Sequence, residues 1–275
     1  MCHFEKPVNK LTNFTTKKIF TRLLTNKSAK NYWNYISELR KRKTEEIYKK
    51  STLLTKSDSL KERVLGVNIL AQFGLPRLHK KEIINILFEL LETETDKEII
   101  SSILYGISHN NEKLNLKQIK FLCSFTTHKS IIVRHSLAFA LCTIDKEIAI
   151  DSLIELSNDK DEEVRDWATF GLGSQLETDT DKIRTALWNR ILDKDEGARF
   201  EAISGLAQRK DKRIKEILKK ELENIDEYGS LILESIEYLN DKSLIPNIEK
   251  QIKLNKISKK INEDWLLNTL NKLKK

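Results

Sequence analysis

The sequence is poor in residues that interrupt helices or cross-link chains. Its 275 residues include three prolines, eight glycines and three cysteines. So few helix breakers favour long α-helices over turn-rich sheets. No apolar run reaches the roughly 18 residues of a membrane span, and residues 1–7 lack the apolar stretch of a secretion signal. The odd number of widely spaced cysteines (Cys2, Cys123 and Cys142) predicts free thiols in a reducing cytoplasm.

Charge is distributed unevenly along the chain. The net charge is +8, yet residues 57–240 carry 26 basic and 33 acidic side chains. The basic excess lies at the ends, with 14 basic against 4 acidic residues in 1–56 and 9 against 4 in 241–275. Such asymmetry indicates either an anionic partner such as nucleic acid or simply a lysine-rich surface. The second interpretation is the simpler one, and both stay open on composition alone.

An apolar frame recurs along the chain. In its best copy, Arg165 is followed by Ala168 three positions later, Gly171 six positions later and Leu172 seven positions later. The last of these positions recurs every 31 to 37 residues, at Leu39, Leu70, Ile107, Leu141, Leu172, Leu206, Leu239 and Leu273. A period of this size is typical of stacked two-element units, each unable to bury its apolar face alone.

Each unit is predicted to contain two helices. In residues 148–157, apolar side chains recur at helical spacing. The polar stretch 158–161 follows as a turn, and Asp161 is the predicted N-cap of the second helix. In that helix Val164, Ala168 and Leu172 form a stripe on one face.

The turn-and-helix segment also carries a recognisable motif. Asp161 is followed by Arg165 and Ala168, and Asp195 is followed at the same spacing by Arg199 and Ala202. This pattern resembles HEAT repeats of the short bacterial type. The resemblance is strong over residues 130–213, fair over 57–110 and weak at both ends.

The resemblance implies an all-α fold, a right-handed α-solenoid of about seven to eight stacked two-helix HEAT-type repeats. The second helices would line a concave face. We expect one solenoid over residues 1–275, with an N-terminal cap and first helix in 1–42, core repeats in 43–240 and a C-terminal capping repeat in 241–275. The family implies no single activity.

Four arginines share one position of the repeat: Arg63, Arg134, Arg165 and Arg199. They could form a cationic ladder for an acidic ligand. Alternatively, each guanidinium bonds a carboxylate or carbonyl of the adjoining turn, where its planar fork suits bidentate acceptors. The structural interpretation is favoured because aspartates recur in these turns, at Asp161 and Asp195.

The positions two and five residues after this arginine are polar and varied, as an exposed inner face would be. Their aromatic and acidic members form the predicted partner-binding set: Tyr105, Phe139, Trp167, Phe170, Glu201 and Glu234. Aromatic side chains beside charge are usual anchors of protein interfaces. The alternative is that Trp167 and Phe170 pack against the first helix of their own unit.

The densest basic cluster is Arg40, Lys41, Arg42 and Lys43. It follows Tyr32, Trp33 and Tyr35, and such a combination could hold phosphates and stack bases. The alternative, which we favour, is a solvated helix end stabilised by the helix dipole.

Catalytic and metal-binding motifs are absent from the sequence. It contains no Gly-rich phosphate loop, no Gly-x-Ser-x-Gly and no His-Glu-x-x-His. The spacing of Cys123, His128 and His135 fits no ligand motif, so no metal and no cofactor are predicted.

Two enzyme families use related helical repeats, the alkylated-base DNA glycosylases and the bilin lyases. For the first, this chain offers Asp166 with Trp167 and Trp188 with Asp193, but its acidic middle would repel DNA phosphates. Nothing in the sequence marks a bilin pocket.

The sequence therefore predicts a cytoplasmic, non-catalytic scaffold or adaptor that binds a protein partner of unknown identity along its concave face, with no membrane association. The alternative is a nucleic-acid-binding HEAT-like protein, extending to a DNA glycosylase-like repair enzyme, that uses the basic N-terminal region.

Overall fold

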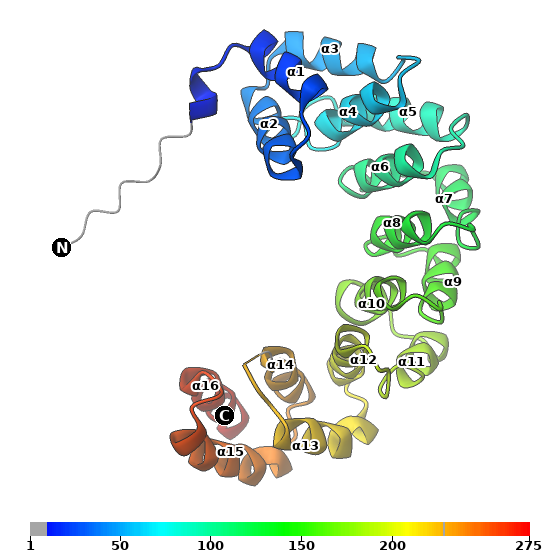
Figure 1. The fold of residues 1–275 in the computed structure, drawn as a ribbon. Coiled ribbons are helices and arrows are strands. Elements are labelled where there is room, and N and C mark those ends of the chain that lie inside the picture. The colour runs from blue at the N-terminus through cyan, green and yellow to red at the C-terminus, as the bar shows by residue number, and fades with distance from the viewer. Residues whose placement is uncertain (1–9, 228) are drawn as a thin grey trace, which may run out of the picture. The chain divides into compact units, whose positions relative to one another are not determined.

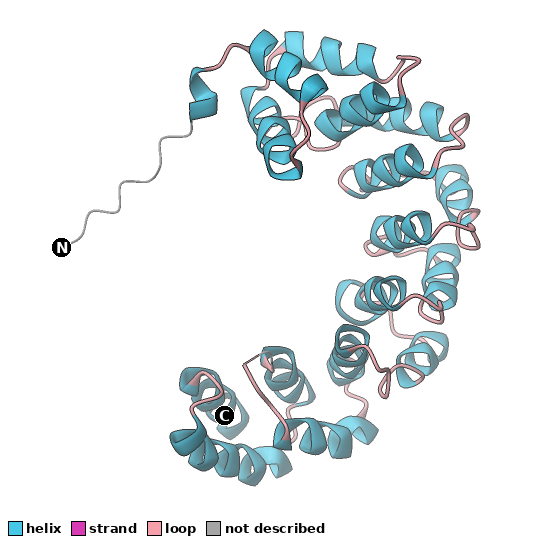
Figure 2. Ribbon diagram, in the orientation of Figure 1, coloured by secondary structure: helices cyan, strands magenta, loops and turns pink. Residues whose placement is uncertain are grey.

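The structure is a computed structural model that describes residues 10–227 and 229–275. These residues form sixteen α-helices and short 3-10 or π turns, and they contain no strand (Figure 2). The prediction of an all-α fold is confirmed. Part of the predicted N-terminal cap, residues 1–9, lies outside the described residues.

The chain divides into two compact units, one ending at Gln118 and the other comprising Ile119–Lys275. We call them unit 1 and unit 2. Unit 1 contains α1 (Thr16–Thr25), α2 (Ala29–Arg42), α3 (Glu45–Leu54), α4 (Leu60–Leu70), α5 (Lys80–Leu91) and α6 (Lys97–Ser108). The boundary falls within α7 (Leu116–Cys123). The single solenoid over residues 1–275 remains a prediction.

Unit 2 continues with the longer series of helices. They are α8 (Ile131–Leu141), α9 (Glu147–Leu156), α10 (Glu162–Phe170), α11 (Asp181–Trp188), α12 (Glu196–Gln208), α13 (Lys215–Glu223), α14 (Ser230–Leu239), α15 (Ile245–Ser258) and α16 (Glu263–Lys274). Over the described residues, the sixteen helices make eight consecutive pairs, within the predicted number of repeats.

The second helix of each pair in unit 2 packs against the second helix of the next pair. The helices α8, α10, α12, α14 and α16 therefore form one continuous row, which we call the inner row. Figure 1 shows this row on the concave side of unit 2, with α9, α11, α13 and α15 on the convex side. In unit 1, α2, α4 and α6 form the corresponding row.

The recurring apolar frame is the core of both units. The eight residues that define the period are all buried, none more than 7% exposed. The small residues of the frame let neighbouring helices approach closely. A Cβ atom added to Gly205 of α12 would lie 2.5 Å from the Cα of Gly173, which follows α10. Alanine does not fit at this contact without a shift of backbone.

The turns before α10 and α12 begin these second helices as their sequence predicts. The Asp161 carboxylate accepts a hydrogen bond from the backbone N–H of Val164 at 3.2 Å, and that of Asp195 accepts one from Ala198 at 2.8 Å. Both are N-caps, which satisfy a backbone donor that the first helical turn leaves unpaired.

One feature that the repeat pattern did not predict follows α10, where the helix continues as a π turn over Gly171–Gln175. The buried Arg209 guanidinium donates to the carbonyls around this turn, including Leu172 O at 2.9 Å, Leu176 O at 2.8 Å and Thr178 O at 2.8 Å. Arg209 thus satisfies carbonyl groups that an ordinary helix end would expose to water.

Candidate protein-binding surface on the inner row of unit 2

The four arginines of the repeat hold the turns together. Arg165 makes two hydrogen bonds of 2.9 Å to the Asp193 carboxylate of the next repeat, and a third to the carbonyl of Asp159 in its own turn. Arg134 bonds the Asp159 carboxylate at 2.6 and 2.9 Å and the His128 carbonyl at 2.8 Å. These guanidiniums therefore link consecutive turns.

Arg63 follows the same rule with other partners, whereas the hydrogen bonds of Arg199 stay within its own repeat. Arg63 bonds Glu94 at 2.6 and 3.1 Å and the Ser57 carbonyl at 3.0 Å. Arg199 bonds the Asp193 carbonyl at 3.0 Å and Glu196 at 3.1 Å. Each guanidinium donates to at least one acceptor in a turn, which is what the structural interpretation of the four arginines expects.

The turns before α10 and α12 each contain two aspartates with different roles. The first, Asp159 or Asp193, accepts the arginine of the preceding repeat, and the second, Asp161 or Asp195, caps the helix. Burial raises the pKa of Asp193, but the hydrogen bond from the Arg165 guanidinium and further bonds outweigh it and lower the pKa overall. The ladder is therefore an internal set of ion pairs.

An aromatic cluster crosses the inner row between α8 and α10. The Trp167 ring lies 4.6 Å from Phe139 and 5.5 Å from Phe170, measured between centroids, with both ring planes inclined at 86°. His135 meets the same indole at 6.1 Å. Such edge-to-face contacts match the quadrupoles of aromatic rings. All four side chains are half-buried, so the cluster fixes its own geometry and still presents ring surface to solvent.

Carboxylates continue the row from α10 to α14. Asp166 lies against the start of α12, where a Cβ on Gly197 would come within 2.5 Å of its Oδ1. Burial, together with the charges of Asp195 and Glu163, raises the pKa of Asp166 to about 6.

Glu201 of α12 is the next carboxylate. Burial raises its pKa, and so do the charges of Asp166 and Glu234, against the lowering effect of a hydrogen bond from the Ser174 hydroxyl. Within the described residues, none of the three carboxylates Asp166, Glu201 and Glu234 forms an ion pair with a cation.

A groove of about 390 Å³ between α14 and α16 ends the row. Trp265, which is 39% exposed, lines it together with Glu234 and Glu237. Glu237 accepts hydrogen bonds from the Thr269 hydroxyl at 2.7 Å and from the Lys272 ammonium. We define the inner-row surface as Phe139, Trp167, Phe170, Asp166, Glu201, Glu234 and Trp265.

The structure places the predicted partner-binding residues in different settings. Phe139, Trp167, Phe170, Glu201 and Glu234 all lie on the inner row of unit 2. Tyr105 lies on α6 of unit 1, where it is half-buried, and its place in a partner-binding face stays a prediction. The ring contacts of Trp167 run to α8 and along α10, within the inner row.

The repeat frame did not predict two residues of the inner-row surface, Trp265 and Asp166, as partner-binding residues. Trp265 precedes the arginine position of its unit by one residue, and Asp166 follows it by one. The sequence signal for Trp265 is a tryptophan in the first turn of the last helix, directly before Leu266 and Leu267.

The basic cluster of residues 40–43 serves partly in packing. Arg40 donates to the Asn68 carbonyl at 3.0 Å, and burial lowers its pKa to about 10. Arg42 bonds Glu38 at 2.9 Å and the Leu11 carbonyl at 2.9 Å. Lys41 and Lys43 are exposed, and they are the members of the cluster whose side chains are most open to an anion.

Of the residue pairs considered for a glycosylase, Trp188 and Asp193 each bond to other residues. The Trp188 indole N–H donates to Asp211 at 3.0 Å, whereas Asp193 accepts from Arg165 and Arg190. In the part of the chain that the structure describes, no group of three or more His, Cys, Asp or Glu side chains is placed to hold a metal ion.

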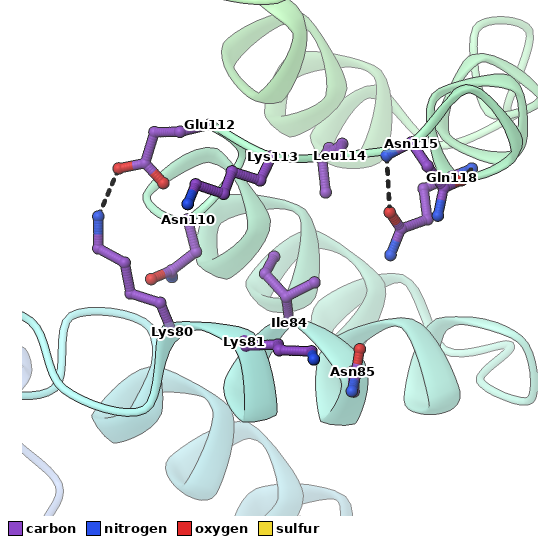
Figure 3. Close-up of a pocket in the computed structure, with 10 residues that line it drawn as sticks. All are labelled: Lys80, Lys81, Ile84, Asn85, Asn110, Glu112, Lys113, Leu114, Asn115 and Gln118. Atoms are coloured by element: carbon purple, nitrogen blue, oxygen red, sulfur yellow. Dashed lines mark hydrogen bonds and ion pairs between the residues drawn. The ribbon is translucent and has the colours of Figure 1, made fainter.

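Unit 1 contains a pocket of about 670 Å³ between α5 and the loop that follows α6 (Figure 3). At its rim the Lys80 ammonium pairs with Glu112 at 2.5 Å. The buried Asn110 donates to the carbonyls of Ala71 and Gly106, both at 2.8 Å, so its amide nitrogen braces the helix ends. The remaining lining is amides, two lysines and the apolar Ile84 and Leu114.

None of the helices in the described part of the chain combines the length and apolar composition that a membrane span requires. Cys142 is buried, and burial raises the pKa of its thiol to about 12; Cys123 is half-buried.

Comparison with known proteins supports the helical-repeat fold. No protein-family model matches the chain. A segment of 124 residues is 37% identical to Protein YibA of Escherichia coli strain K12, covering 45% of this chain and 44% of YibA. The match thus spans less than half the length of that relative.

Two solved structures extend the comparison. The crystal structure of Escherichia coli YibA aligns with a TM-score of 0.73 over 100% of both chains, at 24% identity. An engineered protein aligns with a TM-score of 0.52 over 92% of this chain and 77% of its own, at 18% identity. At these identities the likeness shows the fold alone, and that fold is a stack of helical repeats.

Proposed function

We propose that this chain is a scaffold or adaptor of the HEAT-repeat type, which binds a protein partner on the inner-row surface of unit 2. One observation carries the proposal. A half-buried aromatic cluster, centred on Trp167, adjoins carboxylates that have no cationic partner among the described residues.

The energetics favour binding over a purely structural role. Aromatic rings contribute much of the binding energy at protein interfaces, because they bury a large area with little loss of conformational entropy. Carboxylates that are partly desolvated and unpaired cost folding energy. Such groups do not stabilise the folded state, whereas a partner that neutralises them gains binding affinity.

We propose no chemical step at this surface. Its rings and carboxylates are suited to holding side chains of a partner, and the described residues contain no cluster that would hold a catalytic metal. The partner therefore determines what the scaffold assembles.

The proposal is tested by affinity capture from a lysate of the source organism at moderate salt, with half of each sample treated with nuclease. The wild-type chain should retain a stoichiometric protein after nuclease treatment. The double variant Trp167→Ala, Phe170→Ala should lose it. A matched control, Leu192→Ala with Ile257→Ala, removes apolar groups that are 74% and 87% exposed elsewhere in unit 2. Equal capture by the aromatic variant and the control would contradict the proposal.

Nucleic-acid binding is the second candidate, and one observation favours it. Trp33 near the start of α2 is 52% exposed, and Lys41 and Lys43 at the end of the same helix are exposed as well. Recovery of nucleic acid alone, abolished by Lys41→Ala with Lys43→Ala and by high salt, would assign the function to this region instead.

A further inference from the structure

We propose that the segment seated on the inner-row surface is basic: an extended stretch of a partner protein whose lysine or arginine side chains contact the carboxylates and tryptophans between α8 and α16. This inference rests on the proposed function, and it specifies the chemical class of the partner segment.

Charge complementarity carries the first step. Asp166, Glu201 and Glu234 lie on three successive helices of the inner row and pair with no cation among the described residues. The charges of the other two carboxylates raise the pKa of Glu201, which lies between them in the row. A cationic side chain between them would relieve this repulsion.

Aromatic surface carries the second step. Trp167 and Trp265 flank the carboxylates at the two ends of the surface. A guanidinium or ammonium group binds the face of an indole through its quadrupole, and tryptophan is the best ring for this contact. In the α14–α16 groove, Lys272 forms its close ion pair with Glu237 and acts on Glu234 only at longer range, so Glu234 beside Trp265 has room for a close contact with an incoming cation.

The spacing of the helices suggests the form of the segment. Packed helices lie about 8–10 Å apart, and a polyproline-type strand advances about 9 Å over its three-residue turn. An extended segment would therefore present every third side chain to a successive inner helix. Acidic peptides and nucleic acids would meet repulsion on the same path.

The test uses a short fluorescent peptide with arginine at every third position and glycine or serine elsewhere, titrated against the full chain by anisotropy. A peptide with glutamate in place of arginine is the control ligand. We expect saturable binding of the arginine peptide that weakens with salt. No binding is expected for the glutamate peptide. Equal binding of the two peptides, or no binding of the arginine peptide at low salt, would overturn the proposal.

Variants assign the binding to this surface. Asp166→Asn with Glu201→Gln should weaken binding of the arginine peptide about tenfold or more. The matched control, Glu155→Gln with Glu223→Gln, removes the same charge from the convex helices α9 and α13 and should leave binding unchanged. An equal effect of both variants would show only net-charge attraction and would overturn the proposal.

The neutralised variant also reports on folding. At pH 7.5 its Tm should equal or exceed that of wild type, because it removes charges that burial disfavours. Concentration-dependent self-association that this variant abolishes would assign the surface to a second copy of the chain and contradict the inference. If Trp167→Ala with Phe170→Ala loses a native partner that the neutralised variant keeps, the proposed function stands and the basic segment is wrong.

Discussion

The Arg165 guanidinium forms a bidentate pair with the Asp193 carboxylate, two hydrogen bonds of 2.9 Å that join consecutive repeats of unit 2. Asp193 is part of the turn that begins α12, and it also accepts the backbone N–H of Asp195 at 3.0 Å. One carboxylate thus shapes its own turn and holds the preceding repeat. Evenly repeated arginines therefore need no acidic ligand to explain them.

The first prediction concerns this pair. Arg165→Ala should lower the free energy of unfolding by about 2–3 kcal/mol, because the half-buried Asp193 loses a charged donor. Thermal or denaturant melts measure the loss. Lys160→Ala in the same turn, an exposed side chain, should change stability by less than about 0.5 kcal/mol. Partner capture by folded Arg165→Ala should match wild type. An unchanged melting curve would contradict the structural role.

The second prediction concerns the buried Arg209. Lysine keeps the charge but cannot reach the carbonyls on both sides of the π turn with one ammonium group. Arg209→Lys should therefore destabilise the fold by about 2–3 kcal/mol. Arg213→Lys, at an exposed side chain, is the matched control and should have little effect on Tm. Equal melting of the two variants would show that the π turn does not depend on the guanidinium.

The third prediction concerns the pH dependence of Asp166. Burial first, and then the charges of Asp195 and Glu163, raise its pKa to about 6 from the ordinary 3.8, and the charge of Asp166 in turn raises the pKa of Glu201 on α12. Protonation therefore favours the folded state, and the charged form at pH 7.5 disfavours it. Asp166→Asn should raise Tm at pH 7.5 by about 2–4 °C, which corresponds to about 1 kcal/mol for a half-exposed group.

That gain should shrink as the pH falls through about 6 and vanish below 3.8, where wild-type Asp166 is protonated in both states. His135, which lies 3.9 Å from Glu163, titrates in both proteins and cancels in the difference. A gain that is independent of pH would contradict the raised pKa of Asp166.

The repeated frame made most of the fold predictable. The buried positions such as Leu172 and Leu206 recur at nearly fixed spacing, and Asp161 and Asp195 cap helices as their position indicates. Local periodicity is enough for this because each repeat packs mainly on its neighbours. The π turn after α10 was not predictable, since it depends on Arg209 reaching back from the following repeat.

The candidate site was predictable only in part. Phe139, Trp167 and Phe170 share the expected helix face, but their mutual edge-to-face geometry depends on how α8 packs on α10. The buried environment of Asp166 depends on Gly197 one repeat later. Likewise, Arg40 and Arg42 look like free cations in sequence, but they donate to the carbonyls of Asn68 and Leu11 in distant segments. Tertiary contacts of this kind leave no local signal.

The most direct test of the account is site-specific photo-crosslinking in living cells of the source organism. A photoreactive phenylalanine analogue replaces Phe170 on the inner-row surface in one strain and the exposed Leu192 in another. The account predicts a light-dependent protein adduct from position 170 that excess arginine peptide suppresses, and no such adduct from position 192. An adduct formed equally from both positions, or only from position 192, would contradict binding on the inner row.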